Sequence, residues 1–318
     1  MEAYQNFNIE NGVFKGFSNE IRVPDGVKRI APLSLAPLYQ TRCLVLPSTL
    51  ETFAPSDLRK PYDKATTKGE GSYFMGNTLP RMLEEIRIPV EHPRYQSKNG
   101  ALYSADGKQL IYQPPCHYRK TVEIADGTEE LCEDSCCFVE ADRILFPKTL
   151  RRIAQGACCA CELTRSEIPA CEIGESAFQG CKLPEYVEIY NEVIPKKAFA
   201  NCSHVKGIRL RESVKLLKDE AFSCTHIEKI YIPPVTKIEE NAFLLNQMSW
   251  VVSKWERQMI KNTNVIIGGK AGSPAEAFAG ANGMKFEVVG SSDEEIKAWL
   301  GWVERTETDA VNSDDLPF

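Results

Sequence analysis

The sequence predicts a solenoid, a stack of similar coils in which each coil adds one short strand to a parallel sheet. A phrase of the form apolar–x–x–x–small–aromatic recurs along the chain, and a short alternating apolar segment precedes most copies. The small residue of the phrase marks Ser34, Asp57, Ser135, Ala157, Ala177, Ala198, Ala221 and Ala242. The spacings are 23, 78, 22, 20, 21, 23 and 21 residues, and a period of this length is typical of a solenoid.

The strand of each coil reads apolar, any residue, apolar, and then often proline. The segments that fit are 21–24, 44–47, 86–89, 122–125, 144–147, 187–190, 208–211 and 230–233. Alternation with a period of two indicates a half-buried strand, and proline ends it because proline cannot donate to the ladder. We therefore expect a single curved parallel sheet of short strands, with turns and short helical segments on the other side and a cap at each end.

The recurring phrase also predicts what fills the space between coils. Its aromatic residue should point into the stack, and its small residue lets neighbouring coils approach closely. A cysteine follows in four consecutive copies, where it should act as a small buried apolar side chain. The expected structural ladder consists of Phe178, Phe199, Phe222 and Phe243 together with Cys161, Cys181, Cys202 and Cys224.

The chain has twelve cysteines, which leaves two other interpretations open. A zinc site is conceivable from two groups one coil apart, Cys132, Cys136 and Cys137, and Cys158, Cys159 and Cys161. The repeat already accounts for Cys158 and Cys161, and no partner follows at zinc-finger spacing, so we predict no metal site and no cofactor. Ladder cysteines of adjacent coils also fall within the Cα separation that a disulfide tolerates, so they could form disulfides in an oxidising environment.

The charge distribution argues against nucleic acid as a partner. The net charge is −6, and residues 291–318 alone carry eight acidic and two basic residues. The other 290 residues therefore carry equal numbers of acidic and basic residues. Without a basic excess there is little attraction for nucleic acid or an anionic membrane. No apolar run reaches the roughly 18 residues of a membrane span, and the first residues lack the apolar core of a signal peptide. We expect a cytoplasmic protein, or a cell-surface protein if a leader is missing from this chain.

The predicted solenoid with its caps covers residues 1–290, and 291–318 should form an amphipathic helix and an acidic tail. A polar insertion at about 59–82 and a hairpin repeat at about 99–115, turning at Asp106–Gly107, interrupt the stack. Capping boxes at 273–276 and 292–295 begin two C-terminal helices. The second helix either packs on the last coil as part of the cap or, through Trp299 and Trp302, is a docking segment for a partner.

The repeat resembles the BspA-type leucine-rich repeat, which occurs in bacterial surface and cytoplasmic proteins and in some protists. The pattern IxIP followed by xAFxxC carries the resemblance, supported by NGALYSADGKQLIYQPP at 99–115 and by the closing unit VIIGGKAGSPAEAFAGANGMKFEVV at 265–289. The resemblance covers about residues 8–290. It implies a curved solenoid with its strands on the concave side and a role in protein binding, in some members adhesion to host surfaces.

The residue between the two inward positions of each strand should face outward. Along the middle and later coils these positions bring arginine, aromatic and aliphatic groups together, which is the composition of an interface core. The predicted partner-binding residues are Arg143, Leu145, Arg165, Glu167, Tyr186, Glu188, Arg209 and Tyr231. The alternative is an ordinary solvated sheet face.

No catalytic residues are predicted. The four histidines are scattered. Cys202 and His204 could be considered as a nucleophile and base, but Cys202 belongs to the buried ladder, where its thiol should be inert. The sequence thus favours a non-catalytic interaction or scaffold module that binds an unidentified protein partner through the sheet face, as a monomer or weak dimer. The alternative is a secreted or cell-surface adhesin that binds host or matrix proteins.

Overall fold

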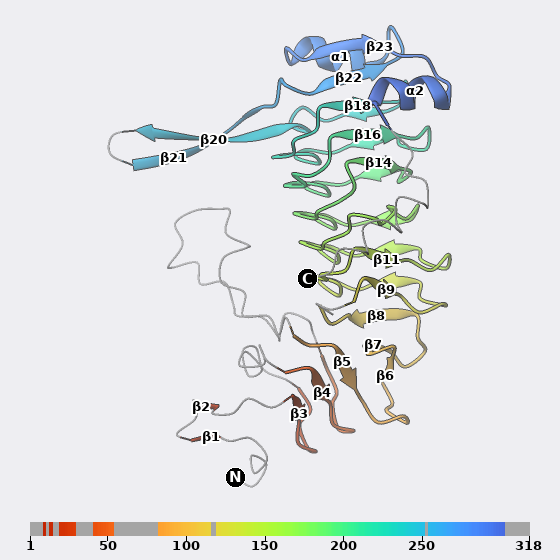
Figure 1. The fold of residues 1–318 in the computed structure, drawn as a ribbon, viewed down its shortest axis with the longest axis vertical. Coiled ribbons are helices and arrows are strands. Elements are labelled where there is room, and N and C mark those ends of the chain that lie inside the picture. Colours follow the sequence, from red (N-terminus) through yellow and green to blue (C-terminus); the bar gives the residue numbers. More distant parts are fainter. Residues whose placement is uncertain are drawn as a thin grey trace, which may run out of the picture.

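The protein is a β-solenoid of stacked coils with parallel sheets along its sides (Figure 1). The computed structural model describes residues 9–10, 13–14, 19–29, 41–53, 82–115, 119–251 and 254–302. The predicted insertion at about 59–82 lies outside the described residues except for its last position, and the acidic tail after position 302 lies wholly outside them.

One long side of the stack is a set of parallel strands, here termed the face sheet. It consists of three hydrogen-bonded groups, in this order: β3 (Glu20–Arg22), β4 (Cys43–Val45) and β5 (Glu85–Arg87); β9 (Thr121–Glu123) and β11 (Arg143–Leu145); and β14 (Tyr186–Ile189), β16 (Gly207–Leu210), β18 (Lys229–Tyr231), β22 (Ile266–Gly269) and β23 (Lys285–Val288). The strands pair in register, so equivalent residues of successive coils lie side by side.

The coil that carries Arg165 forms no regular strand, and Ser166 gives the reason. It occupies the inward position that Ile144 and Val187 fill in the coils on either side. Its buried hydroxyl accepts the backbone N–H of Ile144 at 2.9 Å, in place of a backbone carbonyl. A ladder hydrogen bond is therefore replaced by a side-chain bond, and the face sheet is divided between β11 and β14.

A second set of parallel strands forms sheets separate from the face sheet, where turns and short helical segments were expected. Its members are β8 (Gln109–Tyr112), β10 (Glu130–Leu131), β12 (Arg152–Ile153) and β13 (Glu172–Ile173), then β15 (Val193–Ile194), β17 (Leu216–Leu217) and β19 (Lys237–Ile238). Each two-residue strand consists of one outward-facing residue followed by the inward-facing apolar residue that begins the recurring phrase. Arg152, which forms ion pairs with Glu130 at 2.5 Å and Glu172 at 3.9 Å, shows that charge pairing across coils supports this second sheet.

An antiparallel hairpin enters this second sheet at its beginning. Strands β6 (Tyr95–Lys98), β7 (Ala101–Ser104) and β8 pair antiparallel, and β8 then pairs parallel with β10. The turn falls at Asp106 and Gly107, where the hairpin was expected. The Asp106 carboxylate accepts the Ser104 hydroxyl at 2.6 Å and the Lys108 backbone N–H at 3.0 Å, while Gly107 takes the left-handed φ of 73° that the turn needs.

A second hairpin projects from the side of the stack and was not predicted. Strands β20 (Leu244–Val251) and β21 (Lys254–Lys261) form an antiparallel ribbon that extends well away from the coils (Figure 1). The distance between a marker and the next strand could have predicted this hairpin. From the marker to the first inward strand residue the two preceding coils use 10 and 9 residues, whereas 25 residues separate Ala242 from Ile267.

The core between the coils is a column of aromatic rings beside apolar side chains. Phe178, Phe199, Phe222 and Phe243 are buried, with successive ring centroids 5.5, 5.6 and 5.7 Å apart and nearly parallel planes. Phe278 of helix α1 (Pro274–Ala281) continues the column at 6.0 Å from Phe243. The column runs from one coil to the next, so these rings join the later coils into one core, while Ile21, Leu44 and Ile86 belong to a separate apolar cluster in the first coils.

Three of the four expected ladder cysteines are buried and donate to the preceding coil. The Sγ atoms of Cys161, Cys181 and Cys202 lie 2.9, 2.8 and 3.2 Å from backbone carbonyls there. Cys224 differs because it follows its marker by three residues rather than four. It is only partly buried and has a left-handed φ of 54°, and the buried Thr225 takes the ladder position instead.

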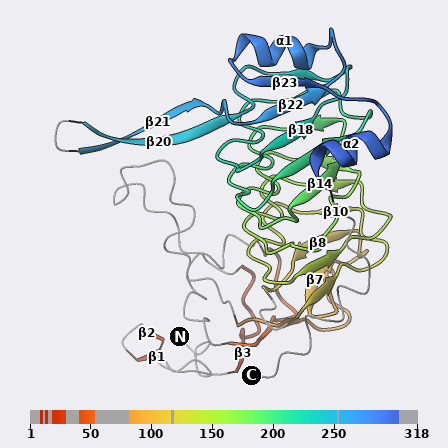
Figure 2. The same cartoon turned by 45° about the horizontal axis from the view of Figure 1, so that its top comes forward.

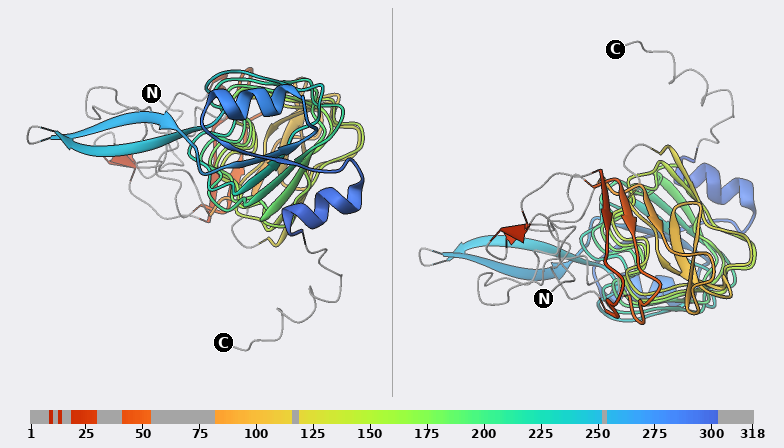
Figure 3. Two further views of the ribbon diagram at one scale, coloured as in Figure 1. Left: turned by 90° about the horizontal axis from the view of Figure 1, so that it is seen from above. Right: turned by 90° about the horizontal axis from the view of Figure 1, so that it is seen from below.

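Two helices follow the last coils and lie on different sides of the stack (Figure 3). Helix α1 (Pro274–Ala281) packs on β19, β22 and β23 at the end of the solenoid, and helix α2 (Asp293–Leu300) packs on β16 and β18 of the face sheet. At the other end, β1 (Ile9–Glu10) and β2 (Val13–Phe14) form a two-stranded antiparallel pair. Within the described residues no helix is long and apolar enough to cross a membrane.

Candidate binding face

The structure places the eight predicted partner-binding residues on one side of the stack but in three different environments. Arg143, Leu145, Arg165 and Glu167 are exposed, Tyr186 and Glu188 are half-buried, and Arg209 and Tyr231 are buried. The solvent exposure of the Tyr231 residue is only 2%. The face is therefore open over the middle coils and closed over the later ones.

Helix α2 closes the later part of the face (Figure 2). It begins at a complete capping box, in which the Ser292 hydroxyl accepts the Glu295 backbone N–H at 3.2 Å and the Glu295 carboxylate accepts the Ser292 backbone N–H at the same distance. It ends at Gly301, whose left-handed φ of 73° suits a helix terminus. The predicted capping box thus starts a helix that folds back over the sheet rather than extending the stack.

The apolar side of α2 makes a small core of its own against the face sheet. Ile296 and Leu300 are buried with Tyr231 and Val289, and three aromatic side chains, Tyr186, Trp299 and Trp302, pack around them. The rings of Tyr186 and Trp302 lie 5.6 Å apart. This cluster shows that the two tryptophans considered as a docking segment are in contact with the protein's own sheet.

Two glycines at outward positions of the strands make room for these rings. A Cβ on Gly207 would come within 2.6 Å of the Tyr186 ring, and a Cβ on Gly268 would come within 2.6 Å of the Trp299 ring. Real side-chain atoms do not approach so closely. Glycine at an outward strand position, where it weakens a strand and often marks a close approach, was the signal in the sequence that something covers this part of the face.

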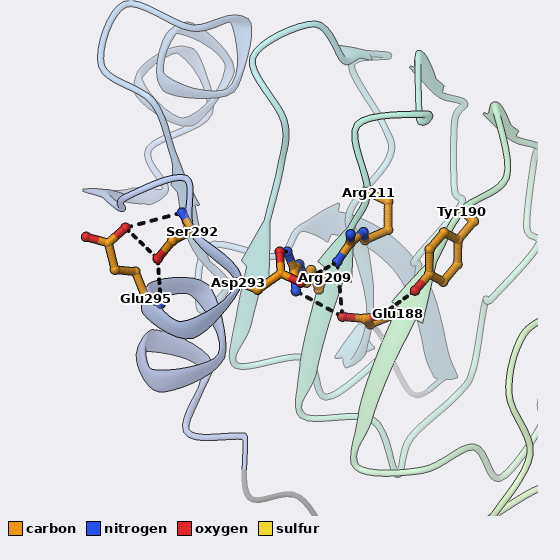
Figure 4. A network of polar contacts seen from close by, with 7 residues as sticks. All are labelled: Glu188, Tyr190, Arg209, Arg211, Ser292, Asp293 and Glu295. Carbon is orange, nitrogen blue, oxygen red and sulfur yellow. Dashed lines mark hydrogen bonds and ion pairs between the residues drawn. The ribbon is translucent and has the colours of Figure 1, made fainter.

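A network of ion pairs joins the first turn of α2 to the sheet (Figure 4). The Arg209 guanidinium, whose side chain is 4% exposed, binds the Asp293 carboxylate on one side and Glu188 at 3.1 Å on the other. Arg211 also binds Asp293, at 3.3 Å. Hydrogen bonds from Arg209 and Arg211 hold the pKa of Asp293 at about 2. Glu188 accepts the Tyr190 hydroxyl at 2.6 Å, so the predicted site residues Glu188 and Arg209 hold the helix in place.

Polar contacts also fix the far end of α2. The Trp299 indole N–H donates to the Glu287 carboxylate at 2.7 Å, and the Lys229 ammonium donates to the Trp299 carbonyl at 2.6 Å. Lys229 lies 5.1 Å from the centre of the same indole ring. Bonds from Lys285 and then Trp299 lower the pKa of Glu287. Both ends of the helix are thus tied to strands of the face sheet.

The open part of the face, here termed the middle face, comprises the outward residues Thr121, Glu123, Arg143, Leu145, Arg165 and Glu167. All are exposed, and Leu145 at 38% is one of the few exposed large apolar side chains in the described part of the chain. Arg143 and Thr121 are register partners, as are Leu145 and Glu123, and the next coil joins through the Arg165 N–H bonded to the Asp142 carbonyl at 2.9 Å. The middle face is therefore continuous across three coils.

The arginines of the middle face differ from those elsewhere on the same sheet. Arg22 and Arg87 both bind Glu20, and Arg209 binds Glu188 and Asp293. Among the described residues, neither Arg143 nor Arg165 has an ion pair or a side-chain hydrogen bond. Their guanidinium groups project into solvent, and so they can bind acceptors on another molecule without breaking a contact within this chain.

The residues that could be drawn as a nucleophile and base have separate partners. Cys202 Sγ lies 3.2 Å from the Phe178 carbonyl, and burial raises the pKa of its thiol to about 12. His204 Nδ1 lies 2.8 Å from the Leu183 carbonyl. A thiol of such high pKa holds its proton at neutral pH and is a poor nucleophile.

Comparison with known proteins agrees with this geometry. Residues 130–248 match the family model described as the BspA type leucine rich repeat region, in six copies. This part of the chain is therefore a BspA-type leucine-rich repeat region, and the protein is a leucine-rich repeat protein. The coils on either side of that region continue the same stack.

The solved structure of one bacterial leucine-rich repeat protein is similar in fold. A leucine-rich repeat protein from Eubacterium ventriosum aligns with a TM-score of 0.53 at 16% identity, over 70% of this chain and 57% of that chain. The pneumococcal vaccine antigen PcpA aligns at 0.47 and 12%, over 80% of this chain and 56% of that chain. A leucine rich cell surface protein from Faecalibacterium prausnitzii aligns at 0.42 and 17%, over 87% and 62%. No curated protein matches the sequence.

Proposed function

We propose that this protein is a non-catalytic interaction module that binds a protein partner through the middle face. The observation that carries the proposal is the pair Arg143 and Arg165, which flank the exposed Leu145 and have no ionic partner among the described residues. Interface cores are enriched in arginine beside apolar side chains, and an arginine that meets a carboxylate across a dry interface is a strong anchor.

The partner that fits this surface is a protein segment that presents acidic side chains around an apolar one. Glu123 and Glu167 lie near the arginines and would repel an acidic segment placed out of register. The covered residues take a supporting part in this proposal. Tyr186, Glu188, Arg209 and Tyr231 hold α2, and α2 forms a fixed border beside the middle face.

The test is a capture experiment from lysate of the native host with two matched baits. The first carries Arg143→Glu, Leu145→Ala and Arg165→Glu. The control carries Arg151→Glu, Lys182→Glu and Val193→Ala, which makes the same change in net charge at exposed positions away from the middle face, with Val193 exposed to 37%. A protein captured by the wild type and the control, and lost by the middle-face bait, supports the proposal. Equal loss from both baits, or from neither, contradicts it.

The cytoplasmic location and the monomer or weak dimer remain predictions. Fractionation of native-host cells with an antibody to the chain separates a cytoplasmic protein from one on the cell surface. Sedimentation of the purified chain over a range of concentrations gives the oligomeric state. If dimers form, charge reversal at Lys285 on the edge strand β23 and at Lys297 on α2 shows which surface joins them.

A further inference from the structure

Two cysteines, Cys137 and Cys159, occupy the same position of adjacent coils, and that position is neither the aromatic nor the ladder position of the repeat. In the coils marked by Ser135 and Ala157, Cys136 and Cys158 fill the aromatic position and Cys161 fills the ladder position. Cys137 and Cys159 instead follow their markers by two residues. The later coils hold Gln179, Ala200 and Ser223 there. These two thiols are thus an addition to the repeat, and they are found in adjacent coils.

The same two thiols lie beside a carboxylate. Asp134 and Cys137 belong to one tight turn, three residues apart, and Cys137 Sγ lies 3.5 Å from Asp134 Oδ1 and 2.9 Å from the Gly156 carbonyl. Cys159 lies in the next coil, joined to the turn by the Phe138 N–H bonded to its carbonyl at 3.0 Å. Asp134 Oδ1 or Oδ2 and the Sγ atoms of Cys137 and Cys159 all lie within 4.8 Å of one another.

The position before the marker shows why the carboxylate can turn toward the thiols. This position is left-handed in successive coils, with φ of 59° at Asp134 and 63° at Gly156. The later coils place side chains there, Ser176, Lys197 and Glu220, and the last two form an ion pair at 3.4 Å. Gly156 has no side chain, and a Cβ there would come within 2.9 Å of Asp134 Oδ1. The glycine therefore leaves room for the Asp134 carboxylate over the next coil.

We propose that Asp134, Cys137 and Cys159 bind one thiophilic divalent cation, of which zinc is the best fit. Tetrahedral zinc, with Zn–S of about 2.3 Å and Zn–O of about 2.1 Å, needs its donor atoms roughly 3.5 to 3.8 Å apart. The Asp134–Cys137 separation of 3.5 Å already meets this requirement, and Cys159 reaches it with a small side-chain movement. Thiolate ligands select zinc over magnesium or calcium, which prefer oxygen.

Binding to this set of donors has a definite proton balance. Zinc takes thiolates, so Cys137 and Cys159 each lose a proton to solvent when the metal binds. Two protons are released for each metal bound, and affinity rises with pH. Three protein donors leave one position of a tetrahedral site for water. The metal would join two adjacent coils where the stacked phenylalanine column has not yet begun.

The test uses cobalt as a spectroscopic probe of the full chain. The protein is reduced with a non-chelating phosphine without oxygen, freed of metal, and titrated with Co²⁺. We expect one Co²⁺ per chain, a near-ultraviolet thiolate-to-cobalt absorption band, and loss of that band when Zn²⁺ displaces the probe. Asp134→Asn keeps the shape and tolerates the left-handed backbone but lacks the charge. It and Cys159→Ser should each weaken Co²⁺ binding at least about tenfold, since loss of outer-shell partners alone costs about 10- to 100-fold.

Cys171→Ser is the matched control, because Cys171 is half-buried and lies outside the cluster. It should bind Co²⁺ as the wild type does, and circular dichroism of every variant checks that the solenoid is folded. Three results would overturn the proposal. They are no absorption band in the folded, reduced wild type, equal affinity in Asp134→Asn and Cys171→Ser, or a Cys137–Cys159 disulfide whose reduced form takes up no cobalt.

Discussion

The indole ring of Trp299 lies over Gly268, so close that a single added carbon on the glycine would come within 2.6 Å of the ring. Gly268 belongs to β22, and Trp299 is the next-to-last residue of α2. The contact determines where α2 sits, and the position of α2 divides the face sheet into a covered part and the open middle face. Both residues are therefore decisive for which surface is available to a partner.

Gly268→Ala should displace α2 from the sheet. The added methyl meets an aromatic ring held by two polar contacts, and overpacking of this kind costs about 1–3 kcal/mol. We expect faster proteolysis between 290 and 302 and a red shift of tryptophan emission. Gly280→Ala is the matched control, because Gly280 is helical and nothing lies within 4 Å of its Cβ position. It should leave α2 unchanged and stabilise the protein by about 0.5–1 kcal/mol.

Phe199→Ala should open the centre of the aromatic column. Phe199 stacks on Phe178 and Phe222, and removing a buried phenylalanine costs about 3–5 kcal/mol. Because each coil contacts only its neighbours, hydrogen exchange should speed up first in the coils around residues 178–222 and only later elsewhere. Uniform acceleration along the whole stack would show that the solenoid unfolds as one unit.

The attachment of α2 should weaken in acid. The folded-state pKa of Asp293, about 2, is depressed below its usual value of about 3.9, so its ion pairs contribute stability above pH 4 and lose it as the pH falls through 4 toward 2. Tryptophan emission followed from pH 6 to pH 2 measures the loss. In Asp293→Asn this part of the transition should be absent at low salt. An identical pH profile in the variant would show that Asp293 does not hold the helix.

The ladder thiols should be unreactive in the native protein. Burial raises the pKa of Cys202 to about 12, so almost no thiolate is present at pH 8. Iodoacetamide should leave Cys202 unmodified in the folded chain and modify it fully in denaturant, as read by peptide mass spectrometry. Rapid native labelling of Cys202 would reveal a low-pKa thiol and would revive a catalytic role.

The sequence predicts the coils well because the repeat is local. Each phrase contains the apolar, small and aromatic residues that form its own turn, so Phe178 and Phe243 could be placed inside the stack without any structure. The single departures were harder to foresee. Ser166 replaces one inward residue and interrupts the sheet, and Cys224 lies one residue short of its ladder position. A consensus drawn from most copies of the repeat does not show where a single copy departs from it.

The candidate site was less predictable because it depends on contacts between distant parts of the chain. Arg209 and Tyr231 occupy outward positions of their strands, so the alternation of inward and outward residues predicts that both are exposed. They are buried because a helix more than 60 residues later returns to cover them. The glycines at 207 and 268 were the only local sign of it. The positions Arg143, Leu145, Arg165 and Glu167 stay exposed because α2 does not reach them.

The central claim is that the middle face binds a protein, and site-specific photo-crosslinking tests it most directly. A photoreactive phenylalanine analogue replaces Leu145 in one protein and Val193, which is exposed to a similar degree, in another, and both are expressed in the native host. We predict that one protein crosslinks at position 145 and not at 193, and that Arg143→Glu with Arg165→Glu abolishes the product. Equal crosslinking at both positions, or a product at 145 that survives the charge reversal, would contradict the account.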